Sequence, residues 1–150
     1  MSTATAVNSS TAPSLTIKRR FKAAPAKVFA AWTDPQKMMR WMGPPSIIRC
    51  DVENDLRVGG RYHIKMVVPG DEHDAQGVYR EIVPNEKVVF TWAWKTTLER
   101  VSLVTVTIKP DGDGSLMTLH HEQFFDEAAR DNHNKGWTAI MDRLAQFVEA

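Results

Sequence analysis

The five histidines of this sequence are the first candidates for acid-base or metal chemistry, because imidazole exchanges protons near neutral pH and binds transition metals. The densest cluster is the His-His-Glu run at residues 120–122. In an extended strand, adjacent side chains point to opposite faces, so this run cannot converge on one ion. We expect His73 and Asp74 in a turn and His133 near the start of a terminal helix, with no spacing that unites them. The sequence therefore predicts no metal site and no cofactor.

His121 is the histidine best suited to a binding site. It shares strand parity with Met117 and Leu119, which places its imidazole on the apolar face. A buried imidazole needs a hydrogen-bond partner, and a ligand could supply one. The alternative is a core histidine already bonded to Tyr79, to a backbone group or to water. Both interpretations remain open at the level of sequence.

Nucleophilic catalysis needs a nucleophile beside a base, or two carboxylates in one pocket. No serine, cysteine, aspartate or glutamate stands in a recognisable setting of that kind. The one acid-base pair that the strand pattern allows is His121 with Tyr79, which could enolise a bound carbonyl compound. We assign no catalytic residue, and the sequence favours a binding protein over an enzyme.

Five tryptophans and seven methionines form a second notable set. Each tryptophan can remove about 150–250 Å² from water, and methionine adapts to occupants of different shape. We expect part of this set to fill a core and part to line a cavity for a small apolar or aromatic molecule. The predicted ligand-binding residues are Met38, Trp41, Met42, Tyr62, Met66, Tyr79, Trp92, Met117, His121, Trp137 and Met141.

The elements that position these residues follow from hydrophobic period and turn residues. A strand is expected from Ser14 to Phe21, then a helix beginning at Pro25, and a second short helix beginning at Pro35 and capped by Asp34. Six further strands, joined by short turns into an antiparallel meander, are predicted at residues 47–52, 61–68, 75–83, 87–94, 101–109 and 116–124.

The last segment, residues 126–148, changes to a helical period. Its apolar stripe consists of Trp137, Ile140, Met141, Leu144 and Val148. Gly136 weakens a helix interior, so we expect it to permit a close approach to the sheet or a bend.

Composition limits the classes of protein that this sequence can encode. Its 150 residues suit one domain, predicted at residues 14–150 after a disordered Ser/Thr-rich tail at residues 1–13. With 19 Lys and Arg against 18 Asp and Glu, the sequence lacks the basic excess of nucleic-acid-binding proteins. No apolar run is long enough to cross a bilayer, and no secretory signal is present. The single Cys50 fits a reducing compartment, so we expect a cytoplasmic protein without a membrane partner.

Six stretches of the sequence carry a resemblance to a known family. They read PAKVFAAWTDPQKMMRWMGP, DLRVGGRYHIKM, GVYREIVPNEKVVFTWAW, VTVTI, LMTLHHEQF and NKGWTAIMDRL. Over about residues 14–148 they resemble the activator of heat-shock-protein-90 ATPase homologue-like family. That family belongs to the helix-grip (SRPBCC) superfamily of START domains, birch-pollen-type allergens and polyketide cyclases. The resemblance implies an α+β fold in which a long C-terminal helix encloses a cavity against a curved antiparallel sheet of six or seven strands, with two short helices after the first strand.

Three functions are compatible with this resemblance, because a shared fold does not fix the activity. The first is binding, sequestration or transport of a small apolar or aromatic molecule in the cavity. The second is an enzyme of polyketide cyclase or hydrolase type, using His121 and Tyr79. The third is a co-chaperone-like interaction module, although the eukaryotic co-chaperones carry an additional N-terminal domain where this sequence has a short tail. Homodimerisation is compatible with all three.

Overall fold

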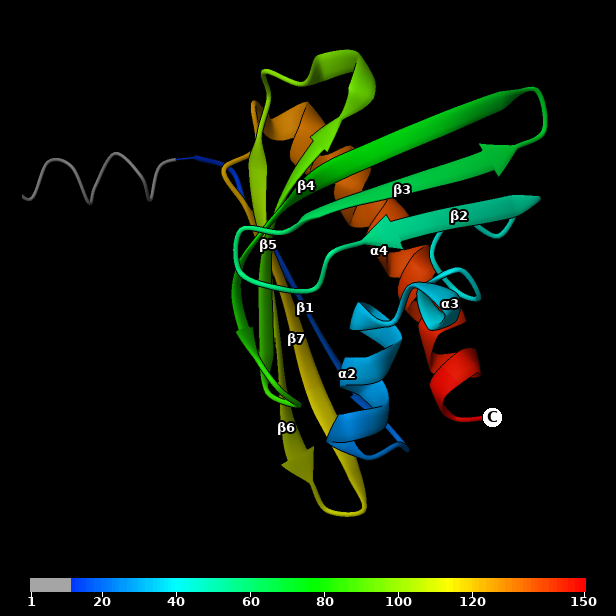
Figure 1. Ribbon diagram of the computed structural model, residues 1–150, viewed down its shortest axis with the longest axis vertical. Helices are drawn as coiled ribbons and strands as arrows, with labels where there is room; N and C mark the ends of the chain where they lie inside the picture. The colour runs from blue at the N-terminus through cyan, green and yellow to red at the C-terminus, as the bar shows by residue number, and fades with distance from the viewer. Residues whose placement is uncertain (1–11) are drawn as a thin grey trace, which may run out of the picture.

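A strongly curved antiparallel sheet dominates the computed structural model, which describes residues 12–150 (Figure 1). Within this range the seven strands are β1 (Leu15–Phe21), β2 (Arg49–Asn54), β3 (Arg61–Val68), β4 (Asp71–Val83), β5 (Lys87–Trp94), β6 (Ser102–Asp111) and β7 (Gly114–Glu122). Their spatial order is β1-β7-β6-β5-β4-β3-β2, so six strands form a meander and β1 pairs with the last of them. The predicted helix-grip sheet is confirmed.

Strands β3 and β7 alternate in burial as their sequences predict, whereas β5 is buried on both faces from Val88 to Ala93. In β3, Tyr62, Ile64 and Met66 are buried and their neighbours are more exposed. In β7, Met117, Leu119 and His121 are fully buried, as parity requires. The inner face of the sheet is therefore continuous from β7 to β3, and it faces the helices.

The hairpin between β3 and β4 is tighter than the sequence suggested. Val68 pairs with Asp71, so only two residues make the reversal, and one of them is Gly70 with a φ of 78°. This turn leaves residues 71–74 free to pair with β3. His73 and Asp74 accordingly lie in β4, and their predicted placement in a turn is wrong.

One glycine permits the close packing of β4 on β5. A Cβ at Gly77 would lie 2.0 Å from the carbonyl oxygen of Thr91 and 2.7 Å from the ring of Tyr62. The Tyr62 hydroxyl donates to that same carbonyl oxygen. The register of the two strands then shifts between Tyr79 and Glu81, which bends the sheet.

Two short helices, α2 (Pro25–Thr33) and α3 (Pro35–Met38), follow β1 as predicted. Pro25 occupies the start of α2, where its missing N–H costs nothing. The Asp34 side chain caps α3 by accepting from the Gln36 backbone N–H at 2.9 Å. Trp32 and Trp41 meet edge to face with ring centroids 4.7 Å apart, so this pair of helices forms one packed unit.

The long helix α4 (Glu127–Val148) crosses the inner face of the sheet, and α2 and α3 lie beside its C-terminal half (Figure 1). Asp126 caps its start by accepting from the Ala129 N–H. Its buried residues are Trp137, Ile140, Met141, Leu144, Ala145 and Val148. No residue in 127–136 is fully buried, so this half of α4 contacts the core only through partly buried side chains such as Ala129 and His133.

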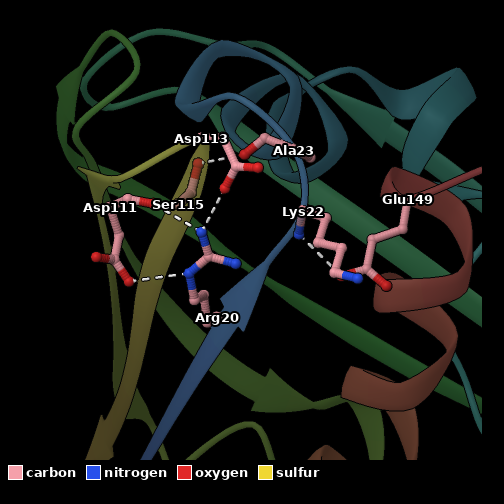
Figure 2. A network of polar contacts seen from close by, with 7 residues as sticks. All are labelled: Arg20, Lys22, Ala23, Asp111, Asp113, Ser115 and Glu149. Carbon is pink, nitrogen blue, oxygen red and sulfur yellow. Dashed lines mark hydrogen bonds and ion pairs between the residues drawn. The ribbon is translucent and has the colours of Figure 1, made fainter.

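Polar contacts fasten the opposite end of the molecule, where the β6–β7 turn and the C-terminus lie (Figure 2). Arg20 of β1 donates to Asp111 at 3.1 Å and to Asp113 at 2.8 Å across that turn. The backbone N–H of Lys22 donates to the Glu149 carboxylate at 2.9 Å. These contacts tie the end of β1 to the β6–β7 hairpin and to the end of α4.

None of the helices within residues 12–150 combines the length and apolar character needed to cross a membrane. The tail is predicted at residues 1–13. Residues 1–11 lie outside the part of the chain that the structure describes. At its inner end, the Pro13 carbonyl accepts a hydrogen bond from the Phe124 N–H at 3.2 Å.

Candidate ligand-binding cavity

A cavity of about 440 Å³ lies between the N-terminal half of α4 and the sheet. Its size is in the range of small-molecule sites, about 300–1,000 Å³. The lining residues come from strands β3 to β6, from α4, from the short 3₁₀ helix η1 (Lys95–Thr97), and from the loops after α3, after η1 and before α4. They are Pro44, Met66, His73, Trp92, Trp94, Thr97, Arg100, Ser102, Phe124, Phe125, Ala129, Asn132, His133, Gly136, Trp137, Ala139 and Ile140.

Small side chains on α4 keep this cavity open. Ala129, Gly136 and Ala139 line it where larger apolar residues would reach the sheet. A Cβ at Gly136 would meet no heavy atom within 4 Å. The close helix–sheet approach that we predicted at this glycine is therefore wrong, because Gly136 faces open space.

A chain of hydrogen bonds supports one wall. The Trp137 indole N–H donates to Nδ1 of His121 at 3.0 Å. Because Nδ1 accepts, the proton of the neutral ring lies on Nε2, which is 2.7 Å from Ser102 Oγ. The serine hydroxyl then donates to the Trp92 carbonyl oxygen at 3.1 Å. Each polar group in this chain has a partner, so the orientation of Trp137 is fixed.

Burial keeps His121 neutral. The side chain is fully buried, and loss of solvation lowers its pKa to about 2, with smaller contributions from His133 and His120. The protonated ring would carry an extra N–H at Nδ1, directed at the Trp137 donor. His121 is thus a hydrogen-bond acceptor for Trp137 at neutral pH.

A second tryptophan–histidine pair supports the facing wall. Trp94 donates its indole N–H to Nε2 of His133 at 2.9 Å, and Nδ1 of His133 lies 2.7 Å from the Ala129 carbonyl oxygen. Burial lowers the pKa of His133. The neutral ring therefore bridges β5 and the first turns of α4.

Trp92 differs from the other tryptophans of residues 12–150. Its indole N–H is buried without an acceptor, whereas Trp32, Trp41, Trp94 and Trp137 each donate a hydrogen bond. Trp92 lines the cavity and lies 5.4 Å, centroid to centroid, from both Trp94 and Trp137. An unmade hydrogen bond of this kind costs about 1–3 kcal/mol.

The sequence profile of the family described as "Activator of Hsp90 ATPase homolog 1-like protein" matches residues 22–149 of this chain. The chain belongs to this family. The match begins just after β1 and includes both short helices, strands β2 to β7 and all of α4. It therefore includes every wall of the cavity.

Solved structures of similar proteins share the fold over nearly the whole chain. A protein from Chromobacterium violaceum is 29% identical, with 91% of this chain and 97% of that chain covered and a TM-score of 0.84. The AHSA1 protein from Silicibacter pomeroyi is 28% identical, with 89% and 96% covered and a TM-score of 0.76. CalU16 from Micromonospora echinospora is 26% identical, with 91% and 76% covered and a TM-score of 0.69. None of the curated proteins matches this chain.

The structure distributes the predicted ligand-binding residues over three places in this Hsp90-activator-like fold. Met66, Trp92 and Trp137 line the cavity, and His121 lies behind Trp137. Met38, Met42, Tyr62 and Tyr79 surround a separate void of about 10 Å³, too small for more than one water. The remaining three, Trp41, Met117 and Met141, are buried and line neither space. This part of the interior is filled because α2, α3 and the C-terminal half of α4 all pack there.

The structure also separates the pair proposed for acid-base chemistry. His121 bonds to Ser102 and Trp137, while the Tyr79 hydroxyl accepts from the Asn54 side-chain amide at 3.0 Å. Burial raises the pKa of Tyr79. Tyr79 and His121 make no hydrogen bond to each other. Tyr79 lines the small void and His121 lines neither space, so the geometry gives no support to a shared catalytic role.

Trp94, Arg100, Phe125 and His133 line the cavity although the sequence reasoning left them out of the site. His133 could have been found, because it lies four residues before Trp137 and so extends the apolar stripe of α4 by one turn. Arg100 and Phe125 stand in irregular segments, where no period indicates direction.

Proposed function

We propose that this protein binds a small apolar or aromatic molecule in the cavity between the N-terminal half of α4 and strands β3 and β5. The observation that carries the proposal is a wall of three indoles, Trp92, Trp94 and Trp137, around an unfilled space. A cavity of 440 Å³ with aromatic walls is thus the feature of this fold best suited to a ligand.

Rigid walls support the same proposal. Trp137 donates to the buried neutral His121 and Trp94 to the partly buried His133, so the indole planes are fixed before a ligand arrives. Preorganised walls reduce the entropy that binding would cost. Met66 lies on the β3 side and supplies an adaptable surface against occupants of different outline.

The proposal is tested with N-phenyl-1-naphthylamine, an uncharged aromatic probe whose fluorescence rises in apolar surroundings. We expect saturable binding to the full chain and an increase in melting temperature with probe concentration. A chain that neither binds this probe nor gains stability from a panel of uncharged aromatic and aliphatic molecules would contradict the proposal.

Gly136→Leu locates the binding site. A leucine side chain at this position extends into the cavity, and it also replaces a poor helix former with a good one, so lost binding cannot be attributed to unfolding. We expect at least a ten-fold weaker affinity for the probe. Ala128→Leu is the matched control, because Ala128 is exposed on the same half of α4 and does not line the cavity. Equal binding by both variants would place the probe elsewhere.

A further inference from the structure

We infer that the ligand of this cavity is an organic anion, with its apolar body against the three indoles and its carboxylate or sulfonate on Arg100. This inference rests on the proposed function and narrows its chemical class. Arg100 and Phe125 lie on the wall opposite the filled core, in the loops that flank η1 and the start of α4.

Stacking on Phe125 holds the Arg100 guanidinium in position and does not involve the N–H groups at its edge. Its central carbon lies 3.9 Å from the ring centroid of Phe125, so the planar group stacks on the phenyl ring. The Arg100 backbone N–H donates to the Thr97 carbonyl oxygen at 2.9 Å, which fixes the turn that carries the side chain. Stacking occupies the face of a guanidinium and leaves the N–H groups around its edge available for a planar anion.

Stacking also accounts for the exposure of Phe125. This side chain is 62% exposed, although it follows the buried Phe124 and lines the cavity. The exposure of this phenyl ring is explained if its role is to stack against the Arg100 guanidinium at the cavity wall. The pair thereby places a positive charge where an amphipathic ligand would have its polar end.

Arg100 lacks a tight protein partner in the described part of the chain. Its closest carboxylate, on Glu99, lies 3.8 Å from Nε, beyond hydrogen-bond distance. Arg143, by comparison, donates to the carbonyl oxygens of Trp41 and Gly43 at 3.0 and 3.1 Å. The Arg100 side chain thus makes no hydrogen bond within residues 12–150 and only a loose ion pair with Glu99, whereas the Arg143 side chain is already used by the fold.

The remaining charges around the cavity favour an anion. None of the lining residues is an aspartate or a glutamate. Two acidic groups on β4, Glu72 and Asp74, border a neighbouring surface groove. Glu72 pairs with Lys65 at 3.3 Å, and Asp74 Oδ1 lies 3.0 Å from His63 Nε2 but makes no hydrogen bond within residues 12–150. A cationic ligand would face Arg100 without compensation, and a neutral one would leave its donors unused. An anion gains charge-assisted hydrogen bonds that the other two classes lack.

The test compares 8-anilinonaphthalene-1-sulfonate with N-phenyl-1-naphthylamine, which share one aromatic body and differ by the sulfonate. We expect the wild-type protein to bind the sulfonate about ten-fold more tightly than the neutral probe, and added salt to reduce this preference. Arg100→Met keeps the length and the apolar stem but removes the charge. It is expected to abolish the preference, by weakening the binding of the sulfonate much more than that of the neutral probe.

Two further variants complete the test. Arg80→Met is the matched control, because Arg80 is exposed on β4 and does not line the cavity, and we expect it to keep the wild-type preference. Arg100→Lys retains the charge without the planar fork, so its preference should be intermediate.

The possible results separate the two proposals. Equal affinities of the wild-type protein for both probes, or equal weakening of both by Arg100→Met, would overturn the anion inference and leave the cavity as a binding site. Loss of the preference in Arg80→Met as well as in Arg100→Met would also overturn it, since net charge would then be the cause. Failure of both probes to bind, or insensitivity of both to Gly136→Leu, would instead contradict the proposed function.

Discussion

Trp137 donates its indole N–H to Nδ1 of the buried His121 at 3.0 Å, joining β7 to α4 at the first fully buried residue of the helix. Upstream of Trp137 the helix has no buried residue, and downstream it packs continuously. This hydrogen bond therefore stands at the boundary between the filled part of the interior and the cavity. The packing of residues 137–148 on the core determines the distance between the sheet and residues 127–136 of α4.

The first prediction compares two tryptophans that are equally buried, at 3% exposure, and that both line the cavity. Trp137→Phe leaves the His121 acceptor unpaired, whereas Trp92→Phe removes an N–H that has no acceptor. The volume change is the same, so we expect Trp137→Phe to lower the free energy of unfolding by about 1–3 kcal/mol more than Trp92→Phe does. Urea unfolding of both variants measures the difference. Equal losses would mean that the Trp137–His121 hydrogen bond contributes nothing to stability.

The period of the strands made much of this fold predictable. The predicted bounds of β3 and β5 coincide with those observed, and the parity argument correctly placed His121 on the inner face. These inferences succeed because an antiparallel meander with short turns fixes each strand by its own sequence. The terminal helix was predictable for the same reason, since its apolar stripe has a single period.

The position of the cavity was not predictable in this way. Tyr62 and Met66 both point inward from β3, yet Tyr62 lies in the filled part of the interior and Met66 lines the cavity. The difference depends on which helix lies above each residue, and that is a property of the tertiary packing. The Arg100–Phe125 stack joins two irregular segments, so neither hydrophobic period nor turn chemistry indicates it.

The second prediction concerns pH. The pKa of His121 in the folded protein is lowered to about 2, against an ordinary value of 6.5, so the unfolded chain binds its proton first as the pH falls. The contribution of His121 to the free energy of unfolding is fully present above pH 6.5. It decreases as the pH falls below this value, by up to about 1.4 kcal/mol per pH unit. His133, whose pKa is also lowered, acts in the same direction.

His121→Gln tests this dependence, because glutamine does not titrate. We expect the variant to be less stable at pH 7, but its free energy of unfolding should fall less steeply between pH 6 and pH 4, by the equivalent of one proton. Urea unfolding at constant ionic strength gives both slopes. Identical slopes for the variant and the wild type would show that His121 does not titrate differently in the folded and unfolded states.

The third prediction sets two glycines against each other. A Cβ at Gly136 meets nothing within 4 Å, so Gly136→Ala should stabilise the protein by about 1 kcal/mol through helix propensity. A Cβ at Gly77 would lie 2.0 Å from the Thr91 carbonyl oxygen, so Gly77→Ala should destabilise it by several kcal/mol or prevent folding. Thermal unfolding distinguishes the two signs. A lower melting temperature for Gly136→Ala would mean that the helix needs the glycine backbone there.

The fourth prediction concerns the attachment of α4 to the loop after α3. The Arg143 guanidinium donates to the carbonyl oxygens of Trp41 and Gly43, at 3.0 and 3.1 Å, and so satisfies carbonyls at the end of a helical turn. Hydrogen bonds from a charged donor contribute about 1.5–3 kcal/mol each, and partial exposure of this side chain favours the lower end.

Arg143→Met keeps the apolar stem and removes both hydrogen bonds, and we expect a loss of about 3 kcal/mol in the free energy of unfolding. Arg143→Lys retains the charge but lacks the planar guanidinium that bonds both carbonyl oxygens. Its loss in the free energy of unfolding should therefore be intermediate. Arg19→Met is a control on β1, because Arg19 pairs with the exposed Asp142 of α4 and surface pairs contribute little. Since Arg143 does not line the cavity, its variants should keep the affinity for N-phenyl-1-naphthylamine while they remain folded. Weaker probe binding by folded Arg143→Met would show instead that this arginine sets the distance between α4 and the sheet.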